Sequence, residues 1–373
     1  MHDRSLLPRP LAPLLGLTTV IVALVGLVAA AVRATPRPAA APEREVVITM
    51  SAVGDVMFGR YNRDQPPKYK PFGLDDPFRH VKHLFKGRDI VTCNLETPIA
   101  PKLYVTPYNG LTMRAEPKAA EVLRDAGFTM AITANNHAFD QGDQGIRDTI
   151  QHLFAAGMGS AGTGLTEEGA FEPWIFSKRG VKVGLLAATL LRNFPPKQRI
   201  GFHAYVEYGK ARAELTPRVR KLKAQVDFVV VSLHLGVEYH QLVSGFERKL
   251  MAELEAAGAD VILGHHPHVL RPFVRTKGQT IFYSLGNFLF DYGFDNTKYM
   301  GIAEVTFAKR GRQREVRSVR FVPVIQDWMR LPVLATGASG KKVRREIYAI
   351  TKPFQAGTRF VEQGEVLEIL PPL

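Results

Sequence analysis

The sequence predicts an α/β fold in which helices cover β-sheets. From Val46 onward, short apolar and β-branched runs end abruptly in Gly, Asn, Asp or His, and a helical stretch usually follows. Alternating strands and helices are typical of α/β folds. Runs that are apolar throughout indicate strands buried on both faces. The predicted strands are Val46–Val53, Ile90–Cys93, Met130–Thr133, Phe228–Leu233, Val261–Leu263 and Ile281–Leu285.

Amphipathic segments between these strands predict helices. They lie at Pro117–Ala126, Gly145–Ala156 and Phe246–Ala257. In the last of these, helical periodicity places Leu250 and Leu254 on one face, as in a helix that packs one side against a core. After residue 301 the pattern changes to the alternation typical of antiparallel strands, and from about residue 330 it becomes less regular.

The N-terminal segment is expected to lie outside the globular fold. Leu11–Val32 is apolar and long enough to cross a hydrocarbon core of about 30 Å as a helix. Arg4 and Arg9 precede it, which favours a cytoplasmic N-terminus, and the proline-rich segment 35–42 predicts a stiff spacer. The alternative is a signal peptide cleaved near Ala29–Ala31. We therefore expect a single-pass membrane protein with an extracytoplasmic domain, or a secreted protein after cleavage.

The charge balance favours an anionic partner. The formal net charge is +14, and Lys309–Arg320 contains a local cluster of basic residues. This cluster suits attraction to an anionic surface or polymer, or it is a solvated hairpin that turns near Gly311. Nucleic acid is not expected, because no aromatic stacking motif accompanies the charge. The single cysteine, Cys93, lies in an apolar run and is predicted to be an inert core residue.

Polar residues follow six of the predicted strands. Ligands of α/β sheets bind at the carboxyl ends of strands, so these side chains are expected to converge. They are Asp55 after the first strand, Asn94 and Glu96 after the second, Asn135, Asn136, His137 and Asp140 after the third, His234 and Glu238 after the fourth, His265, His266 and His268 after the fifth, and Asn287 after the sixth.

These residue types together predict a site for one or two divalent ions of Mn, Fe or Zn. Carboxylates, an amide oxygen and neutral imidazoles are the ligands that these metals share. His266 and His268 are expected on the same side of an extended segment, where they could serve two ions about 3.5–4 Å apart. Taken singly, each residue has another explanation: Asn135 and Asn136 suit a left-handed turn, and Glu238 suits a surface charge. Their occurrence at six strand ends favours a common site.

The motifs resemble a known family. Asn135-Asn136-His137 and Gly264–His268 are similar to the GNH and GHxH signatures of calcineurin-like metallophosphoesterases. The full set resembles the CapA branch, the poly-γ-glutamate capsule-synthesis proteins, over about Ser51–Asp291. The motifs are GDVMFGR from Gly54, NLETP from Asn94, ANNHAFDQG from Ala134, GHHPHV from Gly264 and YSLGNFLFD from Tyr283.

The resemblance implies a metallophosphatase-like sandwich of two mixed β-sheets flanked by helices, with metals at one sheet edge. The chain pattern predicts this domain at 46–325, between the anchor and spacer at 1–45 and a C-terminal extension at 326–373. His137 would be the catalytic acid. Asn94, Asn135, Asp140, Glu238, His265 and Asn287 would lie beside the ligands or the substrate. The implied metal ligands are Asp55, Glu96, Asn136, His234, His266 and His268.

Three positions depart from the related patterns. Met57 stands where phosphoesterases have the histidine of DxH, a loss that the CapA branch shares. Leu235 stands where relatives typically have Trp, and Arg271 stands where Gln is common. The last two are expected to alter the rim of the substrate site without touching the metal.

These features predict a membrane-anchored extracytoplasmic protein, a metal-dependent hydrolase of metallophosphatase type, that acts in biosynthesis or export of an anionic capsule polymer such as poly-γ-glutamate. The expected partners are that polymer, the membrane through one N-terminal anchor, and other capsule-synthesis membrane proteins. Two alternatives stay open. One is an envelope phosphoesterase or amide hydrolase, and the other is a non-catalytic scaffold that binds the polymer.

Overall fold

The computed structural model describes residues 44–62, 74–104, 111–193, 201–291, 294–354 and 357–373. Leu11–Val32 and the proline-rich spacer at 35–42, where the sequence predicts an anchor, lie outside these ranges. Within the described ranges, no helix is both long and apolar enough to cross a bilayer.

A ten-stranded mixed sheet carries the first half of the predicted site. Strand β3 runs parallel to its neighbour β1, whereas β16 on the other side of β1 is antiparallel. In sheet order the strands are β19 (Arg359–Gln363), β20 (Val366–Leu370), β17 (Gln313–Gln326), β16 (Tyr299–Arg310), β1 (Val46–Val56), β3 (Ile90–Leu95), β5 (Met130–Ile132) and β6 (Gly159–Ala161), with β15 (Asn287–Leu289) beside β1 and β18 (Pro332–Leu334) beside β17.

A six-stranded sheet carries the second half of the predicted site. Its order is β13 (Phe273–Arg275), β14 (Thr280–Phe282), β12 (Val261–His265), β11 (Phe228–His234), β9 (Val181–Thr189) and β8 (Trp174–Lys178). The four central strands are parallel, and β8 and β13 are antiparallel edges. Two small ribbons pair β2 (Arg60–Asn62) with β4 (Leu111–Met113) and β7 (Thr163–Gly164) with β10 (Phe202–His203).

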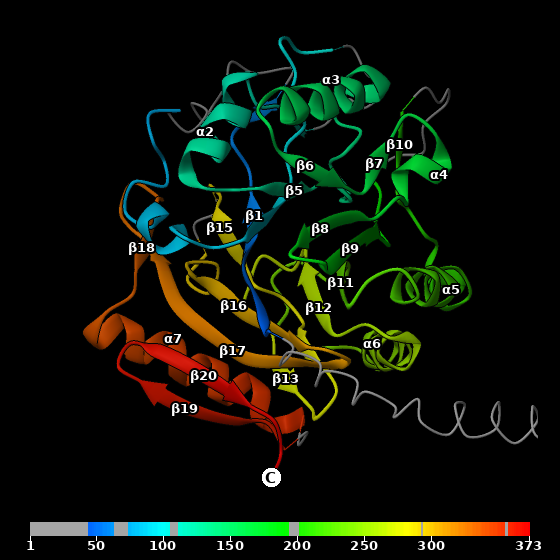
Figure 1. Ribbon diagram of the computed structural model, residues 1–373. Coiled ribbons are helices and arrows are strands. Elements are labelled where there is room, and N and C mark those ends of the chain that lie inside the picture. Colours follow the sequence, from blue (N-terminus) through cyan, green and yellow to red (C-terminus); the bar gives the residue numbers. More distant parts are fainter. Residues whose placement is uncertain (1–43, 63–73, 105–110, 194–200, 292–293, 355–356) are drawn as a thin grey trace, which may run out of the picture. The chain divides into compact units, whose positions relative to one another are not determined.

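The two sheets pack face to face. Side chains of β1 and β16 share one core with those of β11 and β12, and the rings of Phe228 and Phe307 lie 4.9 Å apart across it. Each fully buried side chain of this size contributes about 1.5–3 kcal/mol. The sheets are therefore the inner layers of a sandwich, as expected (Figure 1).

Helices cover the outer faces. Apolar side chains of α5 (Ala211–Lys223) and α6 (Gly245–Ala257) pack against the six-stranded sheet, and those of α2 (Lys118–Ala126) and α3 (Gly142–Ala155) pack against the ten-stranded sheet. The predicted face of α6 is buried. This helix begins at a capping box of Ser244 and Glu247 and ends at Gly258, whose φ of 113° is left-handed. The other helical elements are α4 (Glu167–Ala170), α7 (Gly337–Thr351) and the short 3-10 turns Lys82–Phe85, Tyr208–Lys210 and Lys352–Phe354.

All six predicted strands are present, and two end earlier than expected: the strand predicted at Met130–Thr133 ends at Ile132. The strand predicted at Ile281–Leu285 ends at Phe282, because the chain must turn before Asn287 can pair with β1. Gly286 makes this turn with a left-handed φ of 69°. Its carbonyl oxygen would lie 1.8 Å from a Cβ at Gly54, so residue 54 must be glycine for the two backbones to meet.

The C-terminal part extends the main sheet. A less regular extension is expected from the sequence, but β20 pairs with β17 and α7 adds Val343 and Ile347 to the core. Glu45–Leu373 form one compact unit, and the expected boundary near residue 326 falls inside it.

The basic cluster is the hairpin of β16 and β17. The chain turns at Gly311, where φ is 58°. Carboxylates neutralise much of the cluster: Glu45 contacts Arg317 at 2.6 Å and Arg310 at 3.6 Å, and Asp227 contacts Lys309 at 2.7 Å. The predicted hairpin is confirmed, and several of its basic side chains pair with carboxylates from other segments.

Candidate metal centre

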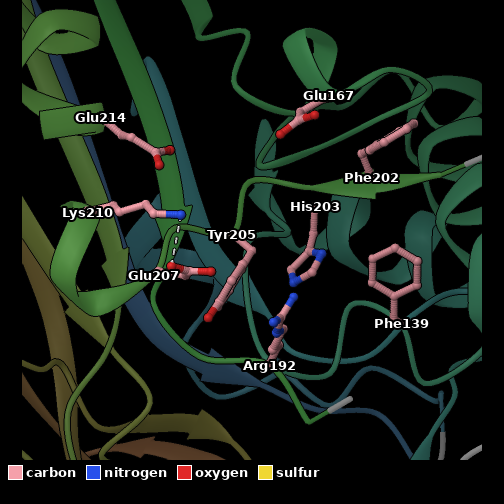
Figure 2. A pocket seen from close by; sticks show the side chains of 9 residues that line it. All are labelled: Phe139, Glu167, Arg192, Phe202, His203, Tyr205, Glu207, Lys210 and Glu214. Atoms are coloured by element: carbon pink, nitrogen blue, oxygen red, sulfur yellow. Dashed lines mark ion pairs between the residues drawn. The ribbon is translucent and has the colours of Figure 1, made fainter. Parts of the chain in front are cut away.

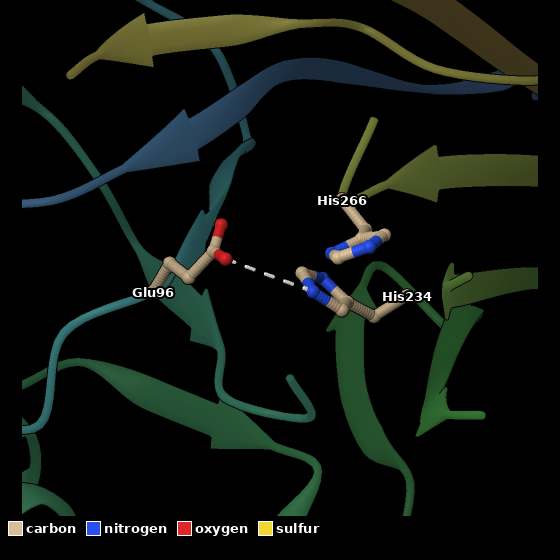
Figure 3. A group of neighbouring side chains, drawn as sticks. All are labelled: Glu96, His234 and His266. Atoms are coloured by element: carbon tan, nitrogen blue, oxygen red, sulfur yellow. Dashed lines mark ion pairs between the residues drawn. The ribbon is translucent and has the colours of Figure 1, made fainter. Parts of the chain in front are cut away.

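The carboxyl ends of strands from both sheets meet at one buried point. Asp55, near the end of β1, is in register with Asn94 of β3 and with Asn287 of β15. On the other sheet, His234 ends β11 in register with His265 of β12. The sandwich therefore brings the carboxylates of one sheet against the imidazoles of the other, as Figure 3 shows for Glu96, His234 and His266.

Three groups of side chains at this point have the spacing of metal ligands. Within each group the ligand atoms lie within 4.8 Å of one another. The groups are Glu96 with His234 and His266, Asp55 with Glu96 and His268, and Glu238 with His266 and His268. Glu96 Oε1 lies 3.7 Å from His234 Nε2 and 3.9 Å from His268 Nε2, so one carboxylate faces both imidazoles.

Hydrogen bonds hold the carboxylates in place. Asn94 Nδ2 donates to Asp55 Oδ1 at 2.8 Å and to Glu96 Oε2 at 3.3 Å. Asn135 Nδ2 in turn donates to Asn94 Oδ1 at 3.1 Å and to the Leu95 carbonyl at 2.9 Å. The expected positions of Asn94 and Asn135 beside the ligands agree with this geometry. Buried carboxylates that are oriented by amides are typical supports of a metal site.

The imidazoles are oriented by similar contacts. His268 Nδ1 lies 2.9 Å from Asn287 Oδ1 and 3.2 Å from Asp55 Oδ2. Both of these atoms accept, so Nδ1 carries the proton and the lone pair of Nε2 points toward Glu96. His234 Nε2 lies 2.8 Å from Asn136 Oδ1. This spacing is close to the roughly 3 Å between adjacent ligands of an ion with bonds of about 2.1 Å.

Burial favours the neutral form of two of the imidazoles, His234 and His266. Burial lowers the pKa of His234 well below its usual value, and neighbouring His266 lowers it further. Burial, followed by the charge of His268, lowers the pKa of His266 to about 3. Neutral imidazoles are the form that binds metal.

Of the two carboxylates, Glu96 is electrostatically unsatisfied, whereas histidine contacts stabilise the charge of Asp55. Burial raises the pKa of Glu96 well above its usual value, and the charges of Asp55 and Glu238 raise it further. Burial also acts to raise the pKa of Asp55, but contacts with His265 and His268 bring it well below the usual range. His265 Nδ1 lies 3.3 Å from Asp55 Oδ1. A cation at this point would stabilise both carboxylates in their charged form.

Unpaired polar atoms give a direct test of whether a metal fits. Among the described residues, Glu96 Oε1 and His266 Nδ1 are buried and have no hydrogen-bond partner. Buried polar atoms without partners are rare because each costs about 1–3 kcal/mol. An ion would give both atoms a partner, so the residues present fit a divalent metal.

The backbone at two of the histidines is left-handed. His266 has a φ of 95° and His268 a φ of 58°. The prediction that His266 and His268 lie on an extended segment is therefore wrong. The strand ends at His265, and residues 266–269 form a bend. The centroids of the His266 and His268 rings nevertheless lie 5.9 Å apart. Strained residues of this kind cluster at functional sites, where the surrounding structure holds them in place.

His137 lies at the edge of this cluster. Its Nδ1 is 2.7 Å from Asp140 Oδ2, and that oxygen also accepts the backbone N–H of Met113 at 2.7 Å. Asn193 was not predicted as a site residue, yet its Oδ1 accepts from Asn136 Nδ2 at 3.0 Å. The sequence offered no signal for Asn193 beyond its place in a loop after a strand.

The three departures from the family pattern are all buried. Met57 packs with Met113 and Phe290 and adds an apolar wall. Leu235 is fully buried, and Arg271 is 1% exposed and forms an ion pair with Glu247 at 2.6 Å. The expectation that Leu235 and Arg271 alter the substrate rim is therefore wrong, because neither side chain reaches the surface.

A cavity of about 190 Å³ is lined in part by residues of the segments that follow β5 and β9 (Figure 2). Phe139 and Arg192, which line it, are close in sequence to Asp140 and Asn193. The Arg192 guanidinium lies 4.3 Å from the centre of the Tyr205 ring. The charged side chains that line the cavity are Glu167, Arg192, Glu207, Lys210 and Glu214, and Lys210 pairs with Glu207 at 3.1 Å.

The sequence profile of the family described as "Bacterial capsule synthesis protein PGA_cap" matches residues 49–292, which is more than half of the chain. The chain belongs to this family. The CapA resemblance drawn from the motifs is thus confirmed, and the matched PGA_cap region contains every residue of the three ligand groups.

Two curated relatives are similar over most of their length. "PGA biosynthesis protein CapA" of Bacillus subtilis (strain 168) is 33% identical over 275 residues, covering 72% of this chain and 70% of that protein. "Capsule biosynthesis protein CapA" of Bacillus anthracis is 30% identical over 370 residues, covering 97% and 86%. Among solved structures, a 5'-nucleotidase from Candida albicans SC5314 matches at 13% identity with a TM-score of 0.43, covering 86% of this chain and 62% of that one. At this TM-score the likeness adds nothing to the PGA_cap assignment.

Proposed function

We propose that this protein acts in the biosynthesis or export of an anionic capsule polymer, such as poly-γ-glutamate, through a divalent-metal hydrolase site. The observation that carries the proposal is the buried group of Glu96, His234 and His266, assembled from both sheets in a member of a capsule-synthesis family. The two CapA relatives support the polymer class.

Six side chains would hold the metal, which we take to be Mn, Fe or Zn. Glu96, His234, His266 and Asn136 surround one position, and Asp55, Glu96 and His268 surround a second. A bound divalent ion supplies a Lewis acid and lowers the pKa of a water molecule.

His137 supplies the proton. When an amide is hydrolysed, its C–N bond breaks and the leaving nitrogen takes up a proton. Asp140 accepts the Nδ1 proton of His137, which leaves Nε2 to carry and release the transferred proton, and the carboxylate stabilises the imidazolium form. His137 is 13% exposed and Asp140 fully buried, so the carboxylate is shielded while the imidazole meets the substrate.

The cavity lined by Phe139 and Arg192 suits one end of the polymer better than its middle. It presents the cationic Arg192 together with the carboxylates Glu167 and Glu214. The amino-terminal residue of a γ-linked chain carries an ammonium and a carboxylate on one carbon, and both groups find an opposite charge there.

We further propose that Leu11–Val32 anchors the protein with Glu45–Leu373 outside the cytoplasm, near other capsule-synthesis membrane proteins. A reporter that is active only outside the cytoplasm, fused after Leu373, should be active and stay in the membrane fraction. A signal found only with a cytoplasmic reporter would disprove this orientation.

One observation favours a second function. Met57 places a thioether where related phosphoesterases have a histidine ligand, which suits a polymer-binding scaffold that has lost turnover. The two functions differ in how they depend on the metal-facing residues.

The test uses the full chain, expressed in a capsule-forming host and purified in detergent. Elemental analysis should find Mn, Fe or Zn in the wild type and little in His234→Ala/His266→Ala, with polymer production or hydrolysis lost. His83→Ala, a change at an exposed histidine outside the cluster, is the matched control. A wild type without metal would disprove the metal site, and full polymer production by the double variant would favour the scaffold.

A further inference from the structure

We propose that Glu238 is a direct ligand of the second cation position, the one that Asp55, Glu96 and His268 surround. This inference rests on the proposed metal function and adds a ligand that the related motifs do not supply. The carboxylate would take the place that Met57 leaves without a ligand.

The second position has room for a further ligand. Asp55, Glu96 and His268 provide three ligands. Three protein ligands and a water complete a catalytic zinc site, but Mn(II), which favours six-coordinate oxygen sites, could take another carboxylate beside the water. Met57 is 1% exposed and packs against Met113 and Phe290, and its thioether is a poor ligand for these ions.

Glu238 lies within reach of that position. One carboxylate oxygen of Glu238 and one nitrogen each of His266 and His268 lie within 4.8 Å of one another. Ligands on opposite sides of an ion with bonds of about 2.1 Å are about 4 Å apart, so a small side-chain movement would bring this carboxylate into the coordination sphere. His268 belongs to both groups and therefore links Glu238 to Asp55 and Glu96.

The shared carboxylate supports two neighbouring positions. Glu96 Oε1 is nearly equidistant from His234 Nε2 and His268 Nε2, at 3.7 and 3.9 Å, and has no hydrogen-bond partner within the described part of the chain. A carboxylate that faces two imidazoles could contribute to both cation positions. Glu238 lies within 4.8 Å of His268, a residue of the second position, and of His266, a residue of the first.

The loop that carries Glu238 is held by a buried arginine. The Arg271 guanidinium donates from Nε to the His240 carbonyl at 2.7 Å and from Nη2 to the Val237 carbonyl at 3.3 Å. These two residues flank Glu238 in the chain. Arg271 Nη1 also donates to Glu247 of α6 at 2.6 Å, so the loop is tied to a core helix. Burying a charged side chain is costly, and here the buried charge positions the backbone on either side of Glu238.

Strained backbone fixes the same loop against the histidines. Tyr239 has a left-handed φ of 62°, and its N–H donates to the carbonyl of Pro267, which lies between the two histidines. Its ring stacks on His268 with the centroids 6.0 Å apart. A Cβ at Gly236 would lie 2.6 Å from Arg271 Nη1, so the backbone passes directly over the guanidinium. A plain connection between β11 and α6 needs none of these features.

Metal stoichiometry tests the inference directly. The full chain, stripped of metal in detergent, is titrated with Mn(II), and bound ions are counted by elemental analysis and calorimetry. We expect two ions in the wild type. Glu238→Gln should keep the first ion and weaken the second by at least 10–100-fold, because the change removes a charged ligand. The magnetic coupling between two adjacent Mn(II) ions in the electron paramagnetic resonance spectrum should disappear with it.

Two further variants separate coordination from other roles. Glu238→His offers a different ligand and should restore the second ion, whereas a carboxylate that merely contributes charge would not be replaced by imidazole. Glu253→Gln removes a carboxylate of α6 that pairs with Arg212, and it should leave both ions bound.

The outcomes distinguish this inference from the proposed function. A wild type that binds one ion, or a Glu238→Gln variant that binds two with unchanged affinity, would overturn the role of Glu238 and leave the metal site of Glu96, His234 and His266 standing. A wild type that binds no ion would overturn both.

Discussion

His137 Nδ1 lies 2.7 Å from Asp140 Oδ2, so a fully buried carboxylate orients an imidazole that reaches solvent at the edge of the ligand cluster. The pair comes from one turn of chain after β5. His137 can therefore hold a proton at Nε2 without a contribution from the candidate metal ligands.

The first prediction concerns this pair. His137→Ala should reduce polymer turnover by about 10²–10⁴-fold, which is the usual contribution of a positioned acid. His137→Gln should be nearly as defective, because glutamine cannot cycle a proton. Metal content, measured by elemental analysis, should stay near normal in both. Wild-type polymer production in both variants at equal protein abundance would favour the scaffold.

The second prediction concerns pH. Because the pKa of Glu96 is raised by burial and by Asp55, the metal-free protein keeps a proton on this carboxyl at pH values where an exposed glutamate has lost it. Metal binding must expel that proton, so the affinity should rise with pH up to the raised pKa and then level off. Calorimetry in buffers of different ionisation enthalpy should detect the released proton. Glu96→Gln should abolish this release, and affinity independent of pH in the wild type would contradict the assignment.

A third prediction concerns the cavity. Arg192→Ala should weaken binding of a short γ-linked glutamate oligomer at least several-fold, since the cation over Tyr205 would no longer meet the carboxylate. Metal content should not change. Arg212→Ala removes an exposed arginine on α5 and is the matched control. Equal oligomer affinity in all three proteins, by fluorescence titration, would exclude the cavity as the binding site.

The fourth prediction concerns stability. Arg271 and Glu247 are 1% and 4% exposed, so Arg271→Leu leaves a buried carboxylate without its partner. Breaking a buried ion pair from one side costs about 3–5 kcal/mol. Urea denaturation should show this loss, and Arg271→Leu/Glu247→Leu should recover much of it. Arg124→Ala, at an exposed pair with Asp125, should change the free energy of unfolding by about 0–1 kcal/mol. A loss that small for Arg271→Leu would refute the role of the pair.

Much of the ligand set could be predicted because local patterns encode it. A strand that is buried on both faces is apolar throughout, so a polar residue at its end is conspicuous, as at Asp55, Asn94 and His234. Parallel strands point their ends to one edge, which predicts convergence before any contact is known. The strand and helix positions followed from the same periodicities.

The sequence could not predict the burial and the neighbours of residues that contact distant segments of the chain. The sequence placed Glu238 beside the ligands or the substrate, with a surface charge as the alternative, and it left Arg271 as a candidate rim residue. Only the packing of the loop after β11 against Pro267 and α6 shows that Arg271 is buried and that Glu238 faces two histidines. The left-handed backbone at His266 could not be predicted from the sequence either, because surrounding contacts impose a φ angle outside the usual regions.

The sequence by itself therefore determined the strands, the amphipathic helices and the family, because burial imposes a periodic pattern on consecutive residues. Only the tertiary structure decided which strand ends meet, that β20 joins β17, and how Glu96 comes to face both His234 and His268. The reason is that two sheets packed face to face set distances between residues more than a hundred positions apart in the chain, and no local pattern records those distances.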